Sequence, residues 1–274
     1  MSRSSFKDSD LIINYHDAVI HGSDLQILES GTGWLNDSCI HFFFALLQHQ
    51  QRSLERCTPH SSFCLLFMDP SVVSCFMHQC TEQDEIQDFV NNTEFPYANK
   101  GGGAIFIAVN DSMSTSSNCW QIPQNGHHWS LLIIDVKSVA GNQGLHVGEH
   151  EGEISFWHFD SIRNSGNMHA AEQIATKIHS HVYDLGGKIH KTPHKSTDIT
   201  VKNIEVIEAK TPQQVNGYDC GVHVLAAAEI ISARMDSSHL PLRALEESLQ
   251  EALGNGSSDF CSKLRRQIAL DIRS

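Results

Sequence analysis

The sequence predicts a single α+β domain that spans residues 1–274. Three observations favour this class. Segments typical of β-strands gather in the middle of the chain, helical segments lie before, between and after them, and no internal repeat or linker-like tract divides the chain. With 40% apolar and 19% charged residues, the chain can bury a substantial core and lacks the composition of a disordered protein.

Three helices are predicted in the first third of the chain. Residues 34–51 (WLNDSCIHFFFALLQHQQ) open with an Asn-Asp start signal and continue as a densely apolar stretch, which is typical of a buried helix. Residues 69–79 and 82–93 have the pattern of two shorter helices, the first with Pro70 near its first turn.

The predicted strands follow a glycine-rich turn and are rich in β-branched and aromatic residues. They are AIFIAVND at 104–111, HHWSLLIIDV at 127–136, EISFWHFDS at 153–161 and ITVKNIEVIEA at 199–209. The Ser-, Asn- and Gly-rich residues 111–127 and 137–152 are predicted loops. A helix over 168–185 is expected to stop at Gly186-Gly187, another follows Cys220, and the last forty residues predict two amphipathic helices.

Charge and patterning exclude several classes of protein. The net charge of −13 repels phosphate, so nucleic acid is not expected as a partner. A protein with a basic surface is the expected partner instead. The N-terminus has no signal-peptide pattern, and the apolar run AIFIAV is far shorter than the roughly 18 residues of a membrane span. We therefore expect a soluble protein of the cytoplasm or nucleus. Its eight cysteines form no CxxC pair, which predicts free thiols in a reducing compartment.

Three polar residues stand where strands end or a helix begins: His128 in GHHWSLLI, Asp160 in WHFDS and Cys220 in NGYDCGVHV. A helix N-terminus and a neighbouring imidazolium both favour a thiolate, the nucleophilic form of cysteine. A carboxylate can orient the imidazole, and an amide can stabilise an oxyanion. Gln214, six residues before Cys220, can supply that amide. Taken singly, a buried thiol, a strand histidine and a turn aspartate are the simpler interpretations; together the residues favour a Cys–His–Asp site.

The order HWSLL, FDS and QVNGYDCG resembles the sentrin/Ulp-type cysteine proteases, which remove ubiquitin-like modifiers from proteins. WLND near the N-terminus and IFIAVND before the histidine strand are also similar to that family, and the whole set resembles its deneddylating branch most. The resemblance spans roughly residues 10–234. It implies a papain-like, adenain-type α+β fold, with a central mostly antiparallel sheet flanked by helices.

The resemblance also implies residue roles. His128 would be the general base, Asp160 its orienting partner, Cys220 the nucleophile and Gln214 the oxyanion donor. Family members thread the Gly-Gly tail of the modifier through a narrow channel, which would be roofed here by Trp129. Asp37 is similar to the residue that holds the tail or its arginine.

Three further residues of the matching segments, Asn36, Asn110 and Trp34, complete the expected substrate-binding set. For Trp34 itself, packing in the core is the favoured interpretation, because tryptophan is a large hydrophobe. The sequence departs from the family in two long segments, residues 111–126 and the insertion between His128 and Asp160.

The histidine-rich segment KIHSHVYDLGGKIHKTPHK does not predict a metal site. His179 and His181 are two residues apart, so on a helix they point to different faces, and no cysteine or carboxylate completes a tetrahedral set.

The sequence thus predicts a thiol isopeptidase that needs no cofactor. It would release a ubiquitin-like modifier ending in Gly-Gly from its conjugates and also process the modifier's precursor. The neddylation modifier is favoured over SUMO, and the protein is expected to be a monomer. Three alternatives remain: a SUMO-specific protease, a same-clan acyltransferase that loads Cys220 with an acetyl group, and a non-catalytic module that only binds the modifier.

Overall fold

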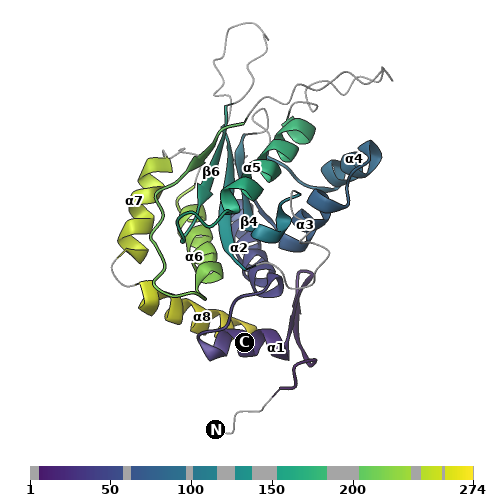
Figure 1. The fold of residues 1–274 in the computed structure, drawn as a ribbon. Coiled ribbons are helices and arrows are strands. Elements are labelled where there is room, and N and C mark those ends of the chain that lie inside the picture. Colours follow the sequence, from purple (N-terminus) through teal and green to yellow (C-terminus); the bar gives the residue numbers. More distant parts are fainter. Residues whose placement is uncertain are drawn as a thin grey trace, which may run out of the picture.

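The computed structural model describes residues 6–57, 63–96, 101–115, 127–137, 153–183, 204–235, 242–254 and 257–273. At its centre lies a five-stranded sheet in the order β3-β4-β5-β6-β7 (Figure 1). The strands are β3 Cys64–Met68, β4 Gly103–Asn110, β5 Trp129–Val136, β6 Ile154–Phe159 and β7 Val206–Glu208. The sheet is mixed: the two central pairings, β4–β5 and β5–β6, are antiparallel, and the two outer pairings are parallel.

Helices cover both faces of this sheet (Figure 1). One face carries α2 Asp37–Cys57, α6 Cys220–Ser232, α7 Leu242–Leu253 and α8 Ser257–Arg273, together with α1 Gly22–Ser30. The other face carries α3 Pro70–His78, α4 Gln83–Asn92 and α5 Asn167–Ile178. Two short turns, η2 Asp111–Met113 and the π-helical η4 His179–Tyr183, extend from β4 and α5. A two-stranded hairpin, β1 Leu11–Tyr15 and β2 Ala18–His21, precedes α1.

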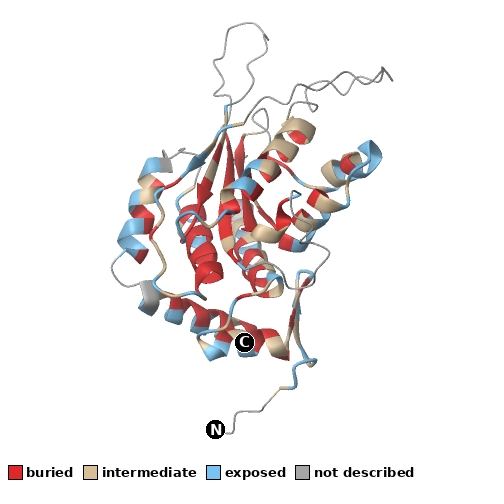
Figure 2. Cartoon of the chain, viewed as in Figure 1, coloured by how far each residue is buried: buried red, intermediate tan, exposed pale blue. Residues whose placement is uncertain are grey.

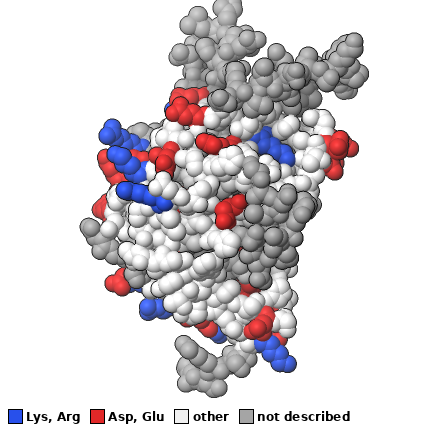
Figure 3. All heavy atoms as spheres, viewed as in Figure 1, with Lys and Arg blue, Asp and Glu red and all other residues white. Residues whose placement is uncertain are grey.

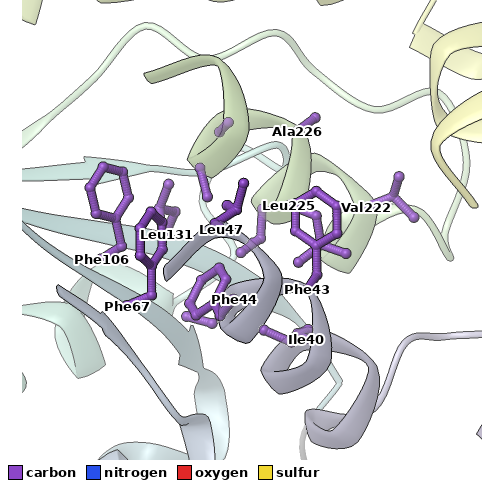
Figure 4. Close-up of a cluster of buried hydrophobic side chains, with 14 of the residues drawn as sticks. Ile40, Phe43, Phe44, Leu47, Phe67, Phe106, Leu131, Val222, Leu225 and Ala226 are labelled. Carbon is purple, nitrogen blue, oxygen red and sulfur yellow. The ribbon is translucent and has the colours of Figure 1, made fainter. Parts of the chain in front are cut away.

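The alternation of side chains along β4 divides the core into two parts. Phe106 points into the cluster beneath α2 and α6, whereas its neighbours Ile105 and Ile107 point into the cluster beneath α3 and α5. This is the period of two that a strand imposes, and because both faces are covered, every residue of β4 is buried. Figure 2 shows the buried sheet between its helices, and Figure 4 shows the first cluster, in which Phe106 lies beside Phe67, whose ring stacks on it, and beside Leu131.

The predicted α+β class is confirmed, and the predicted helices and strands are found where the described residues cover them. The sequence did not reveal four elements, β1, β2, α1 and β3. Two predictions lie outside the described residues: the helix stop at Gly186-Gly187 and the insertion after residue 137. Of the strand predicted at 199–209, the structure describes residues 204–209, and these contain β7.

The surface adds two observations. None of the helices in the described ranges is long and apolar enough to cross a membrane. On the face that Figure 3 shows, basic and acidic side chains are interspersed across largely uncharged surface.

Candidate active site

Strand pairing brings His128 and Asp160 together. His128 directly precedes β5, Asp160 directly follows β6, and these strands are antiparallel with Leu131 opposite Phe159. The start of one strand therefore lies beside the end of the other. His128 Nε2 lies 2.6 Å from Asp160 Oδ1, and the two side chains are almost completely buried.

Asp160 is fixed by donors on its own loop. Its Oδ1 also accepts a hydrogen bond from the backbone N–H of Ile162 at 2.8 Å, and its Oδ2 accepts one from the Ser165 hydroxyl. Burial alone would raise the pKa of Asp160, but the hydrogen bonds from His128, Ser165 and Ile162 outweigh burial and lower it. The carboxylate is therefore ionised and its orientation is set.

The environment of His128 favours its charged form. Burial acts to lower the pKa of this imidazole, but the hydrogen bond and charge of Asp160, together with the nearby Cys220, raise it from 6.5 to about 9. Nδ1, the nitrogen not used by Asp160, is buried, and no hydrogen bond joins it to another described residue. The carboxylate therefore holds one ring nitrogen, and the other is unpaired in a ring whose pKa the Cys220 thiol affects.

Cys220 is the first residue of α6, and only 3% of it is exposed. A thiolate at this position would face the positive end of the helix dipole. The next residue must be small: a Cβ on Gly221 would lie 2.9 Å from the Cβ of Leu35. The carbonyl of Leu35 also accepts a hydrogen bond from Trp129 Nε1 at 2.9 Å. Leu35, two residues before α2, therefore contacts both the helix that begins at Cys220 and the predicted channel roof.

Gln214 lies on the loop that precedes α6 and is bound to the Asp160 loop. Its backbone N–H donates to the carbonyl of Ser161 at 3.0 Å, and its Oε1 accepts from the Ser161 hydroxyl at 2.7 Å. Nε2 donates to the carbonyl of Asn216 at 2.6 Å. Because a primary amide carries two N–H groups, one remains to donate to an oxyanion.

The predicted substrate-binding residues divide into two groups. Trp34 was expected in the core, and that interpretation is wrong: 51% of it is exposed, and its ring meets His127 edge-on at 6.4 Å. Asp37 is exposed at the first residue of α2. Trp129 is partly buried and held by its bond to Leu35. These three side chains are placed where a ligand can reach them.

Asn36 and Asn110 instead use their side chains within the chain. Asn36 Oδ1 accepts from the N–H of Cys39 at the start of α2, and its Nδ2 donates to Asp24 at 2.7 Å. Asn110 Oδ1 accepts from the backbone and hydroxyl of Ser112 at 3.0 and 2.6 Å. Both are helix caps, so they shape the segments on which the exposed residues stand.

Sequence reasoning missed a buried polar network beneath His128. Asn167, the first residue of α5, donates from Nδ2 to the carbonyls of Val109 and His128 and to the hydroxyl of Ser130. His158 lies within hydrogen-bond distance of the same hydroxyl at 2.8 Å, and burial lowers its pKa to about 4. No motif marks these residues, although the Ser-Gly-Asn start of a helix at 165–167 offered a weak signal.

The other described cysteines lack this environment. Burial raises the pKa of Cys39 and of Cys261 to about 12. Among the described residues, no group of three or more His, Cys, Asp or Glu side chains is placed to hold a metal ion.

Comparison with known proteins identifies the family. The profile of the Ulp1 protease family, C-terminal catalytic domain, matches residues 33–252. A probable sentrin-specific protease 8 of Dictyostelium discoideum is 32% identical over 219 residues, which are 80% of this chain and 74% of that protein. The NEDD8-specific protease 1 of Arabidopsis thaliana is 29% identical, over 82% of this chain and 76% of its own length. Sentrin-specific protease 8 of Homo sapiens is 27% identical over 81% of each.

Solved structures agree in fold. The C-terminal Ulp1 protease domain in complex with Smt3, the yeast ortholog of SUMO, superimposes with a TM-score of 0.54 at 19% identity, covering 97% of this chain and 88% of that one. The chain belongs to the Ulp1 family of cysteine peptidases, and its fold is the Ulp1 protease fold.

Proposed function

We propose that this Ulp1-family cysteine peptidase cleaves after the C-terminal Gly-Gly of a ubiquitin-like modifier, preferring the neddylation modifier, and that it both deconjugates and matures it. The observation that carries the proposal is the 2.6 Å contact between buried His128 and Asp160, beside a cysteine that begins a helix. Relatives named as NEDD8-specific and sentrin-specific 8 proteases support the choice of modifier.

In the proposed mechanism, the Cys220 thiolate attacks the carbonyl carbon of the final glycine and forms a C–S bond, while the carbonyl electron pair moves onto oxygen. Gln214 donates a hydrogen bond to that oxyanion. When the intermediate collapses, the C–N bond breaks and the leaving amine takes a proton from His128. His128 then takes a proton from a water whose oxygen attacks the thioester carbonyl. The C–S bond breaks, the modifier leaves as a carboxylic acid that ionises in solvent, and the thiolate and the protonated His128 are restored.

We further propose that Trp129, Asp37 and Trp34 contact the modifier's tail. The contact between Gly221 and Leu35 and the bond from Trp129 to Leu35 support a narrow approach to the thiol. Only residues without a Cβ allow an indole to come so close to their backbone. Asn36 and Asn110 contribute to this surface through the helices that they cap.

The remaining parts of the proposal concern the whole protein. We propose that residues 1–274 form one domain that acts as a monomer in the cytoplasm, the nucleus or both, since a reducing compartment keeps a catalytic thiol free.

The test is a kinetic comparison on matched fluorogenic conjugates of the neddylation modifier, SUMO and ubiquitin. We expect the highest kcat/KM for the first, no turnover by Cys220→Ala, and labelling of Cys220 alone by an electrophilic modifier probe. Preference for SUMO would favour the SUMO-specific alternative. Cleavage of none of them together with hydrolysis of an acetyl ester would favour an acyltransferase, and binding without any turnover would favour a non-catalytic module.

A further inference from the structure

A buried arginine from the C-terminal helix reaches the residue before the nucleophile. Arg265 lies in α8, beyond residue 252 where the family match ends, and only 1% of it is exposed. Its Nε and Nη2 donate to Asp219 Oδ1 at 3.0 and 2.8 Å, and Nη2 also donates to the carbonyl of Tyr218 at 3.0 Å. Such a buried pair is costly to form unless its geometry is good, and breaking it leaves a charge without a partner.

The second oxygen of Asp219 is also used. Asn216 Nδ2 donates to Asp219 Oδ2 at 2.7 Å, and Asn216 Oδ1 accepts from the backbone N–H groups of Tyr218 and Asp219 at 3.1 and 3.0 Å. These bonds close the turn that leads into α6. Asn216 supplies the local bonds of this turn, and Arg265 connects it to a helix 46 residues further along the chain.

Charge gives this contact a consequence for the chemistry. Asp219 is adjacent to Cys220, so an uncompensated carboxylate there would oppose both the thiolate and the oxyanion. His223, one turn into α6, faces the same carboxylate, but burial lowers the pKa of this imidazole and keeps it neutral near pH 7. Cys261 of α8 also lies near Asp219 and is not ionised at that pH. Among the described residues, the guanidinium of Arg265 is therefore the cation that pairs with Asp219.

We propose that Arg265 is a positioning residue for the nucleophile: it fixes the turn before Cys220 and neutralises the carboxylate beside the thiol. This inference rests on the proposed role of Cys220, and Arg265 itself touches neither substrate nor reacting atoms.

The first experiment compares Arg265→Gln with Arg266→Gln, which removes the exposed neighbouring arginine. In full-length protein, we expect Arg265→Gln to lower kcat about 10- to 100-fold with KM nearly unchanged, since a small displacement of the nucleophile is costly. Arg265→Lys, which keeps the charge without the two-nitrogen contact, should lie between wild type and Arg265→Gln. Arg266→Gln should match wild type. Equal kcat in both glutamine variants would overturn the proposal.

A double variant separates positioning from stability. Arg265→Gln alone is expected to lower the Tm, because it leaves Asp219 buried without its cation. Arg265→Met combined with Asp219→Asn removes both charges, so the Tm should recover while kcat stays low, as the tether to the turn is still missing. Recovery of both Tm and kcat would show that the turn needs no tether from Arg265 once the carboxylate is neutral, and would overturn the part of the proposal that assigns it a positioning role.

Alkylation of Cys220 by iodoacetamide needs no modifier and so tests this inference apart from the proposed function. Followed by mass spectrometry at pH 7, the rate at Cys220 should fall about tenfold or more in Arg265→Gln, whereas the rate at exposed Cys75 should not change. If wild type cleaved no modifier but this slowing were still seen, the proposed function would fail and the role of Arg265 would stand. An unchanged rate at Cys220 would overturn the role of Arg265.

Discussion

Replacing Asp160 by asparagine tests the contact on which the site depends. The substitution keeps the size of the side chain but removes the charge that faces His128 Nε2 at 2.6 Å. In the wild type, burial lowers the pKa of His128, yet the hydrogen bonds and charges of Asp160 and Cys220 raise it to about 9. Without the carboxylate, burial should prevail and the imidazole should lose its proton near neutral pH.

The magnitude follows from linkage between protonation and folding. A rise from 6.5 to about 9 corresponds to ~3 kcal/mol of stability. Because the folded-state pKa is raised, this contribution is complete below pH 6.5 and is lost as the pH rises through 9. The lowered pKa of Asp160 affects stability only at acidic pH: its contribution is present above pH 3.8 and is lost as the pH falls through the folded-state pKa. Between pH 6 and 8.5, the wild type should lose about 2 kcal/mol from the pair.

Urea unfolding at pH 6 and at pH 8.5 measures this loss. Thiols such as Cys39 and Cys261, whose pKa burial raises from 9.0 to about 12 in the folded protein, begin to ionise in the unfolded state at pH 8.5. Every variant carries these thiols, so their contribution cancels when the variants are compared. Asp160→Asn should show less than half of the wild-type change, and Asp88→Asn, at an exposed position of α4, should show all of it. In a serine triad the same replacement lowers kcat about 10⁴-fold, and a thiol enzyme should lose less. Wild-type pH dependence together with wild-type kcat in Asp160→Asn would refute the reasoning.

Three further substitutions test the surroundings of the thiol. Gln214→Ala should lower kcat about 10²- to 10³-fold with little change in KM, and a raised KM at constant kcat would assign Gln214 to substrate binding. Gly221→Ala places a Cβ 2.9 Å from Leu35 and should cost about 1–3 kcal/mol of stability by urea unfolding; an unchanged midpoint would mean that Leu35 moves aside freely. Trp129→Phe keeps a ring but loses the bond to Leu35, so kcat/KM should fall while the Tm changes little, and unaltered kinetics would remove Trp129 from the channel.

His128 and Asp160 were predictable from sequence because strand ends are local features. Each residue adjoins an apolar, β-branched segment, and antiparallel neighbours bring such ends together. Cys220 was predictable for a similar reason, since a helical pattern starts at it. The same local signals located α3, whose N-cap Asp69 accepts from the N–H of Ser71 just before Pro70.

Features that lack a distinctive local signal, or that depend on distant contacts, could not be predicted. The turn of the β1–β2 hairpin uses His16 and Asp17 at positive φ, without the glycine that usually marks such a turn. β3 is a five-residue apolar run, which periodicity alone does not assign to strand or helix. The exposure of Trp34 and the pairing of Asp219 with Arg265 depend on segments far apart in the chain, so no local pattern indicates them.

The burial of the site limits what can react there. Cys220, His128 and Asp160 are 3%, 6% and 7% exposed, so the proposed reaction requires a substrate that brings its carbonyl to the thiol on a thin segment of chain. Leu35 sets one boundary of that approach, because it packs against Gly221 and fixes the indole of Trp129. The same burial strengthens the contact between His128 and Asp160, since charges interact more strongly away from water. In the proposed mechanism access and reactivity therefore have one structural cause, and a change that opened the approach to bulkier tails would also weaken the ion pair between His128 and Asp160.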